Sequence, residues 1–421
     1  MTTHLYQRRQ QQWRQQIQQR QLGAATPVLT SPLTPAYINI TSDGDTVQRQ
    51  SGKLVDIPID LNFSGRLGLD SNYTSTTDLT AQLALNWNPG GPFGDRLVVF
   101  DGTATWKKFS SGQLTIKATD SAQTGSSISG TTITGLTSTA QLVPGMTLTN
   151  STGTGTLAAG TVISTIVSAT SITVNNAASV NGTLTNLTFK LPASTVFDVI
   201  LVNDAGTLRL LWGPAWSSAT ARASVLAIQN GINVNSGSWT TGWTNGAATV
   251  PTLTGLYLGT VYVGTTAGQL NDSGGSGATG GLRFVWNAFN RTPRTLQLNP
   301  SNASTSSASL AEIGGAGNGR VQYVVGLAGE ALEYNQVWGW SSNGGAGVGY
   351  ALFDVGEDNT TGSTGIVDSE CAAGFQQSVS NSHVLIPAIG LHYLAMLYGS
   401  NGTQTASVVG AHTYLTALFL A

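Results

Sequence analysis

The chain has only one cysteine and very few charged side chains for its length. Of its 421 residues, 9% are Asp, Glu, Lys or Arg, whereas about 25% is usual in globular proteins. The single Cys371 excludes an intrachain disulfide, and in the apolar segment ECAAGF it is most simply a small buried residue. A hydrophobic content of 40% excludes the composition of a disordered chain. We therefore expect a folded protein with a surface of hydroxyls and amides, held together by packing or oligomerisation.

The charge balance and the hydropathy pattern exclude several classes of partner. The net charge is −2, and the body has no basic stripe of the kind that nucleic acids require, so we expect no nucleic-acid partner. No uninterrupted apolar run reaches the roughly 18 residues of a membrane span, and no apolar segment follows the N-terminal charges as it would in a secretory signal. We expect no membrane insertion. A surface with little electrostatic self-repulsion is typical of fibres, spikes and shell proteins.

The ionisable residues form no recognisable catalytic or metal-binding motif. The four histidines lack metal-ligand spacing, and His392 and His412 lie in apolar segments, which favours core or interface positions. The glycine-rich segments 314–319 and 343–349 lack the strand and helix that flank a phosphate-binding loop, so we interpret them as β-turns. We predict a protein that is not an enzyme and that has no cofactor and no bound metal.

Three weaker alternatives remain open. Local carboxylate pairs could cleave glycans if the fold turned them into one cleft: Asp43/Asp45, Glu357/Asp358 and Asp368/Glu370. The oxygen-rich segment 353–360 could bind calcium through Asp354, Glu357, Asp358 and Asn359. Close tryptophan pairs favour core or interface packing, but exposed tryptophans could stack on sugars: Trp212/Trp216, Trp239/Trp243 and Trp338/Trp340.

Alternation of apolar and polar residues with period two dominates the body and predicts a mainly β protein of antiparallel sandwich or jelly-roll-like domains. We divide it into a β domain at 36–111 that continues at 191–300, an inserted small β domain at 112–190, and a C-terminal β domain at 301–421. The insert has strict alternation, and one core can be lined by Val162, Ile166, Ile172, Val174, Leu184 and Leu187. The flanking segments ATWKKFSSGQL and LPASTVFDVILVND are expected to be neighbouring strands. We also expect a hairpin around 204–206 and one short helix at 218–231.

Residues 1–35 differ from the rest and are expected to form a docking helix followed by a Pro-containing linker. Residues 4–22 are rich in Gln and contain four arginines and no acid. A helix here would be about 27 Å long, and Tyr6, Trp13 and Ile17 would lie on one side of it. A solvated, frayed tail is the alternative, but a free tail gains nothing by exposing a tryptophan. The predicted docking residues are Tyr6, Arg9, Trp13, Arg14, Ile17 and Arg20.

Several segments resemble a known family in the same order along the chain. They are DRLVVFDGTATWKKF, FDVILVNDAGTLRLLWGPAWSSATAR, LYLGTVYVGTTAGQ, LRFVWNAFNRTPR and PAIGLHYLAMLYG. Together they resemble tailed-bacteriophage virion structural proteins of the tail-fibre or head-fibre-like kind, over about residues 50–421. The insert is similar to small β modules that recur in phage tail and capsid-associated proteins. The resemblance implies a virion location, with assembly in the host cytoplasm and release by lysis, and it transfers no catalytic motif to this sequence.

The resemblance and the composition together predict a tail fibre or adhesin. The chain would form a homotrimer that attaches through its N-terminus to other virion proteins of the tail or capsid. Its β body would contact the host surface, with a surface glycan as one candidate receptor. A capsid decoration or head-fibre protein is the alternative, and a tailspike polysaccharide depolymerase is a third. A bacterial surface adhesin is disfavoured because no export signal is found.

Overall fold

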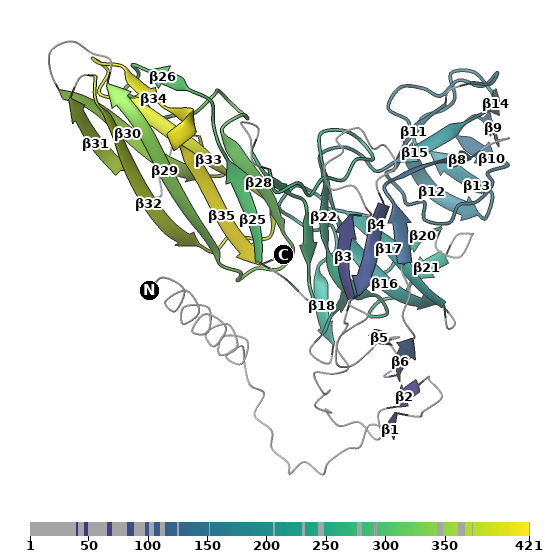
Figure 1. The fold of residues 1–421 in the computed structure, drawn as a ribbon. Helices are drawn as coiled ribbons and strands as arrows, with labels where there is room; N and C mark the ends of the chain where they lie inside the picture. The colour runs from purple at the N-terminus through teal and green to yellow at the C-terminus, as the bar shows by residue number, and fades with distance from the viewer. Residues whose placement is uncertain are drawn as a thin grey trace. The chain divides into compact units, whose positions relative to one another are not determined.

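The structure is a computed structural model, and it describes most of the chain from residue 114 onward. That part runs to residue 420 with gaps at 124–125, 151, 205–206, 230–231, 243–247, 276–279, 290, 292, 343–347, 361–366 and 373. Before it, six short strands are described (Figure 1): β1 Asn39–Ile40, β2 Thr46–Gln48, β3 Gly65–Leu69, β4 Gln82–Trp87, β5 Leu97–Phe100 and β6 Thr105–Phe109. The predicted N-terminal helix and linker lie outside the described residues.

The described chain is built of antiparallel sheets, which confirms the predicted mainly β class. One pair of strands, β23 (Leu282–Arg283) and β28 (Arg320–Val325), is parallel. Among the described residues the helical structure is a single 3₁₀ turn, η2 (Gly410–His412). No helix in this part of the chain is both long and apolar enough to cross a membrane.

The first strands form two small sheets. One has the order β1-β2-β6-β5, and the other has the order β3-β4-β7, in which β7 is Leu114–Lys117. Strand β6 pairs with β2 and β5, whereas β16 (Thr195–Asp204) pairs with β17 (Thr207–Ala215) and β22 (Leu256–Val263). The expectation that the segments flanking the insert form neighbouring strands was therefore wrong, because each has other partners.

Residues of the predicted insert form two sheets around a shared core. One sheet has the order β12-β13-β10-β9-β14 and the other β11-β15-β8. Their strands are β8 Thr119–Gln123, β9 Ser126–Ser129, β10 Thr132–Thr134, β11 Thr147–Thr149, β12 Ile163–Ser168, β13 Ser171–Val174, β14 Gly182–Leu184 and β15 Leu187–Lys190. Five of the six predicted core residues are buried, but Val162 is half-buried and Ile163 takes its place. The register of β12 shifts between Ile163 and Thr165, which offsets the alternation there.

The chain enters and leaves this segment at one point. Thr119 and Lys190 are register partners in β8 and β15, and the Leu191 N–H donates to the Ala118 carbonyl at 2.8 Å. A short connection could therefore join residues 118 and 191 without moving either strand.

The middle sheet has the order β17-β16-β22-β19-β18, and β24 also pairs with β22. Its strands are β16, β17 Thr207–Ala215, β18 Leu226–Gln229, β19 Ile232–Asn235, β22 Leu256–Val263 and β24 Val285–Asn287, with the hairpin β20 Trp239–Thr241 and β21 Ala248–Val250 beside them. Asp204 pairs with Thr207, which confirms the predicted hairpin. The predicted helix at 218–231 was wrong, because a Ser218–Ala221 bridge and strand β18 occupy it.

Strands β16 and β22 are buried on both faces. In β16, Phe197, Val199 and Leu201 belong to a core shared with the insert and β3. The alternate residues Val196 and Ile200 belong to a second core, which continues into the C-terminal strands. The sheet is therefore a middle layer that links two hydrophobic cores.

One ion pair crosses this middle layer. Asp198 of β16 is 7% exposed and accepts two hydrogen bonds from Arg222, at 2.7 and 3.2 Å. Arg222 also donates to the carbonyl of Gly326 at 2.6 Å and lies over the ring of Trp216 at 4.5 Å. A Cβ at Gly326 would lie 2.1 Å from the Tyr257 hydroxyl, so the close approach requires glycine. The guanidinium joins the middle sheet to the end of β28.

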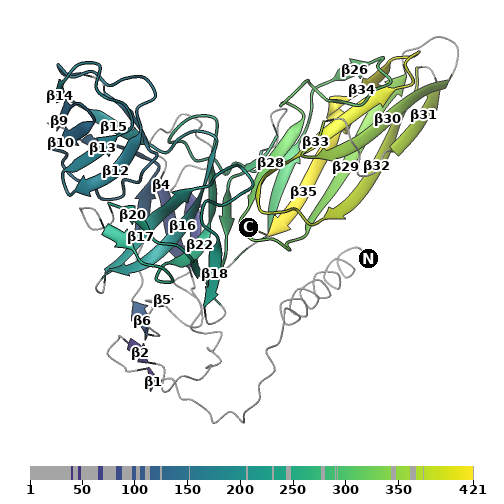
Figure 2. The same ribbon diagram turned by 180° about the vertical axis from the view of Figure 1, so that it is seen from behind.

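The C-terminal strands form a sandwich of two sheets, which face each other in Figures 1 and 2. One sheet has the order β23-β28-β33-β30-β31, with β27 also on β33. The other has the order β25-β35-β29-β34-β26, with β32 also on β29. The remaining strands are β25 Pro293–Leu298, β26 Ala303–Thr305, β27 Ala311–Glu312, β29 Leu332–Ser342, β30 Val348–Glu357, β31 Val367–Ala372, β32 Gln376–Leu385, β33 Gly390–Ser400, β34 Ala406–Val408 and β35 Tyr414–Leu420.

The core of the sandwich is aromatic. Trp338 of β29 stacks on Phe353 of β30 with ring centroids 4.7 Å apart. Cys371 is 5% exposed, which confirms its predicted burial. Strand β25 pairs with β35, so the sandwich includes residues that precede the boundary we predicted at residue 300.

Removal of the insert is the test of its independence. We expect a chain in which residues 120–189 are replaced by a short Gly-Ser connection to keep a folded body, because Ala118 and Leu191 are already hydrogen bonded. Circular dichroism and a cooperative thermal transition measure this. As a control, the same linker replacing β29 should unfold the sandwich. Loss of the transition in the insert deletion would show that the body depends on the insert.

Candidate functional site

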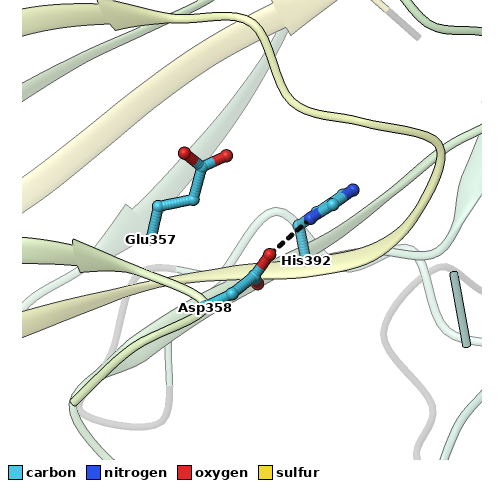
Figure 3. Close-up of side chains that lie close together, drawn as sticks. All are labelled: Glu357, Asp358 and His392. Atoms are coloured by element: carbon cyan, nitrogen blue, oxygen red, sulfur yellow. Dashed lines mark hydrogen bonds and ion pairs between the residues drawn. The ribbon is translucent and has the colours of Figure 1, made fainter.

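Three ionisable side chains converge at one end of the sandwich (Figure 3). Glu357 is the last residue of β30, Asp358 follows it, and His392 lies near the start of β33. The two strands are antiparallel neighbours, with Glu357 opposite Leu394. One ligand atom of each of the three side chains lies within 4.8 Å of the other two. Strand pairing thus brings residues 34 positions apart into one cluster.

Asp358 continues the strand pairing beyond β30. Its backbone N–H donates to the carbonyl of Tyr393 at 3.1 Å, and its carboxylate Oδ1 accepts from the Tyr393 N–H at 2.9 Å. Its φ of +52° is the left-handed conformation that Asp tolerates better than most residues. This turn directs the second carboxylate oxygen toward His392.

Both ring nitrogens of His392 have partners. Nδ1 lies 2.7 Å from the Asp358 carboxylate, and Nε2 lies 2.9 Å from the carbonyl of Ala388. Burial alone would lower the pKa of His392, but the hydrogen bond and charge of Asp358 outweigh it and raise the pKa. The pKa of Glu357 is also raised, by burial and by the neighbouring Asp358 charge. A protonated ring would donate to both oxygens, because a carboxylate and a carbonyl can only accept.

This arrangement can hold charge, but it is poorly placed for proton transfer to a substrate. The His392 side chain is 4% exposed and Asp358 is 41% exposed. A general base must reach the proton that it removes, and neither nitrogen of His392 faces outward. The cluster combines one imidazole with two carboxylates, which is a donor set that divalent metal ions accept.

The remaining histidines differ from one another. The predicted core position is confirmed for His392. His412 is exposed in η2 and is therefore not a core residue, so for this histidine the interface position stays a prediction. His383 is exposed in β32, where its ring lies 5.8 Å from that of Tyr334.

The carboxylates named from the sequence are distributed over different sites. Asp354 is fully buried within β30 and is not one of the three clustered residues. Asp368 and Glu370 are exposed two residues apart on β31, so they share one face of an edge strand. Asp43 and Asp45 lie outside the described residues. The structure thus joins Glu357 and Asp358 to a histidine that the calcium hypothesis did not include.

Four of the paired tryptophans are core residues. Their side chains are at most 6% exposed, so the packing interpretation is confirmed and stacking on sugars is wrong for Trp212, Trp216, Trp338 and Trp340. Trp239 is half-buried and lines a pocket of about 290 Å³ with Pro144, Ile166 and Pro214. Trp243 lies outside the described residues.

The glycine-rich segment 314–319 is a turn whose amide groups bind an internal anion. The Glu312 carboxylate accepts from the N–H groups of Gly317 and Gly319 at 3.0 and 2.9 Å. Arg320 donates its Nε–H to the same carboxylate at 2.9 Å, and its Nη2 donates as well. The turn interpretation is confirmed for this segment, because its amides are already occupied. Residues 343–347 of the second segment lie outside the description.

The predicted docking residues Tyr6, Arg9, Trp13, Arg14, Ile17 and Arg20 all lie outside the described residues. Their role stays a prediction. Sequence reasoning also missed the Asp358–His392 pair, and the available signal was weak: a histidine in an apolar strand and an acid after another strand.

Comparison with known proteins places the chain in no family. No protein family matches it, and no curated protein matches its sequence. A solved structure of infectious bursal disease virus, Gx strain, shares 13% sequence identity over 72% of this chain and 76% of that chain, with a TM-score of 0.18. A TM-score at that level carries no argument about fold or function.

Substitution of Glu312 by Gln tests the internal anion. Burial disfavours its charge, but Arg320 and the two glycine amides outweigh burial and hold the pKa of Glu312 below its usual value. Its contribution is therefore fully present above the unfolded-state pKa and is lost as the pH falls through the folded-state pKa. At pH 7 we expect Glu312→Gln to lower the free energy of unfolding by about 3 kcal/mol. The gap from wild type should shrink in acid.

Urea unfolding of the sandwich at pH 7 and at acidic pH measures both effects. The exposed Glu370→Gln is the matched control and should change the free energy little at either pH. A gap between wild type and Glu312→Gln that is the same at both pH values would contradict the role given to the carboxylate charge.

Proposed function

We propose that this chain is a non-enzymatic structural protein of a phage virion, and that it acts as a tail fibre or adhesin. The resemblance of its segments to tailed-phage virion proteins supports the proposal. The structural observation behind the proposal is that the few charged side chains pair with one another inside the chain. Five arginines each pair with a carboxylate within the body: Arg209–Asp204, Arg222–Asp198, Arg283–Asp272, Arg291–Glu330 and Arg320–Glu312.

These ion pairs use several of the few charged side chains inside the fold. Four of the five arginine side chains are less than a fifth exposed, so their charges stabilise the sheets rather than attract a substrate. What remains outside is largely hydroxyl, amide and glycine backbone. The interactions of such a surface change little with ionic strength, which suits a particle component that acts outside the cell.

The location on the particle decides between the proposed roles. Labelling of the chain in purified particles, followed by electron microscopy, should place the label on the tail. A label distributed over the shell would instead support a capsid decoration or head-fibre protein. Cleavage of a capsular polysaccharide by the purified chain would overturn the non-enzymatic assignment in favour of a depolymerase.

Attachment is assigned to residues 1–22. We expect Tyr6, Trp13 and Ile17 changed together to Ala to yield a folded protein that no longer enters particles, because the apolar side of the docking helix is lost. The matched control changes Gln11, Gln15 and Gln18 to Ala, which lie on the opposite side of such a helix, and it should incorporate normally. Quantitative mass spectrometry of purified particles measures incorporation. Equal incorporation of both variants would refute the anchor.

A homotrimer would also cover an open sheet edge. In the described sheets β32 pairs with β29 alone, over ten residue pairs without a register shift. Its sequence, QQSVSNSHVL, contains no Lys, Arg, Asp, Glu or Pro. Val384 in the strand is 56% exposed, and Phe375 and Ile386, which flank it, are 69% and 55% exposed. Monomeric proteins usually protect such an edge with charges, prolines or bulges, and β32 has none of them.

Lysines placed on β32 test this assembly. Light scattering should give wild type three times the 43.5 kDa chain mass, and Ser380→Lys with Ser382→Lys should reduce it to one chain, because charges on the edge repel between copies. Ser127→Lys with Ser129→Lys is the matched control: these serines are also exposed and two apart, but they lie in β9, between β10 and β14. A monomeric wild type, or a trimeric β32 variant, would contradict the proposal.

A further inference from the structure

We propose that Glu357, Asp358 and His392 form a binding site for a divalent transition-metal ion such as Zn²⁺. The ion would take Nδ1 of His392 and one oxygen from each carboxylate, and water would complete its coordination. The site is independent of the proposed virion role and uses none of the predicted docking residues.

The positions of the three donors already approximate a coordination sphere. With metal–ligand bonds of about 2 Å, any two donors on one ion lie within roughly 4 Å of each other. The three ligand atoms here lie within 4.8 Å of one another, so small side-chain rotations close the site. Figure 3 shows the three side chains close together, with the Asp358 carboxylate hydrogen bonded to the His392 ring.

The histidine is held as a metal ligand is usually held. Its Nε2 lies 2.9 Å from the backbone carbonyl of Ala388, which fixes the proton on Nε2 and leaves Nδ1, 2.7 Å from the Asp358 carboxylate, as the nitrogen that can bind a metal ion. Metal-ligating histidines commonly donate their second N–H to a carbonyl or carboxylate in this way. The ring also packs 5.6 Å from that of Tyr323 and is nearly fully buried. Its orientation is therefore set by groups outside the cluster.

The cluster offers two carboxyl groups and one imidazole to a bound ion. A divalent ion that displaces the Nδ1 proton would neutralise both carboxylates and replace the Asp358–His392 hydrogen bond by two metal bonds.

The donor types select the class of ion. Calcium and magnesium prefer sites made of oxygen ligands, whereas one imidazole nitrogen with carboxylate oxygens suits zinc and related transition ions. The ion would bind the end of β30 to the start of β33. Leu391, which precedes His392 in β33, donates its N–H to the carbonyl of Ala219 at 2.9 Å, so the site also supports the point where the 217–222 segment meets the sandwich.

Metal titration of the full chain tests the proposal. After treatment with a chelator and its removal, calorimetric titration with ZnCl₂ should give one ion per chain, and saturating Zn²⁺ should raise Tm because the ion binds the folded state. Co²⁺ should give visible absorption bands from nitrogen and oxygen ligation. Glu357→Gln, Asp358→Asn and His392→Asn should each weaken Zn²⁺ binding by roughly tenfold or more.

The controls separate this site from surface binding and from misfolding. His412→Asn and Glu370→Gln remove an exposed histidine and an exposed carboxylate outside the cluster, and both should bind Zn²⁺ as wild type does. The Glu357→Gln variant keeps size and shape, so it reports on the site even if His392→Asn fails to fold. No Zn²⁺ binding by wild type, unchanged binding by Glu357→Gln, a loss of binding in His412→Asn, or a response to Ca²⁺ alone would each overturn the proposal.

Discussion

The burial of strands β16 and β22 on both faces is the constraint on which the rest of the body depends. Their alternate residues enter two different hydrophobic cores, so neither strand has a solvent face. A charge in such a strand is tolerated only when it is paired and hydrogen bonded. Asp198 meets that condition through Arg222 and through Thr260, whose hydroxyl donates to it at 2.7 Å. Arg222 also donates to the Gly326 carbonyl, which follows β28. The residue that neutralises Asp198 in the middle sheet therefore also links that sheet to the C-terminal sandwich.

A buried and paired charge is also found in the sandwich. Glu312 organises the glycine-rich turn by accepting from its amides, a role that a bound phosphate has in nucleotide-binding loops. Arg320, which neutralises that carboxylate, lies over the ring of Tyr393 at 4.1 Å. Tyr393 in turn donates to Asp358. The internal anion and the three-residue cluster are therefore attached to the same segment of β33, from its two sides.

Local patterns predicted the parts of the fold that local interactions decide. The 204–206 hairpin and the alternation of the insert follow from turn residues and period-two burial. The predictions were wrong where contacts between residues far apart in the sequence determine the structure. Residues 218–231 have apolar and small side chains that are compatible with a helix. In the fold, however, Arg222 forms an ion pair with Asp198 and β18 pairs with β19. The prediction of Val162 as a core residue was wrong because the register of β12 shifts, and Ile163 is buried in its place. A period-two pattern cannot predict such a shift.

Only part of the candidate site could be predicted from the sequence, because the rest depends on distant contacts. The acidic turn at 357–358 is a local feature, whereas its pairing with His392 depends on the register between β30 and β33. That register places Glu357 opposite Leu394, and it lets Asp358 pair with the backbone of Tyr393. A slip of one residue would turn every side chain of β33 to the opposite face, and it would remove His392 from the carboxylates. The aromatic core prevents that slip, because Tyr323, opposite His392 in β28, is fully buried against Phe419. The packing that fixes the sandwich thus also fixes which three side chains meet at its end.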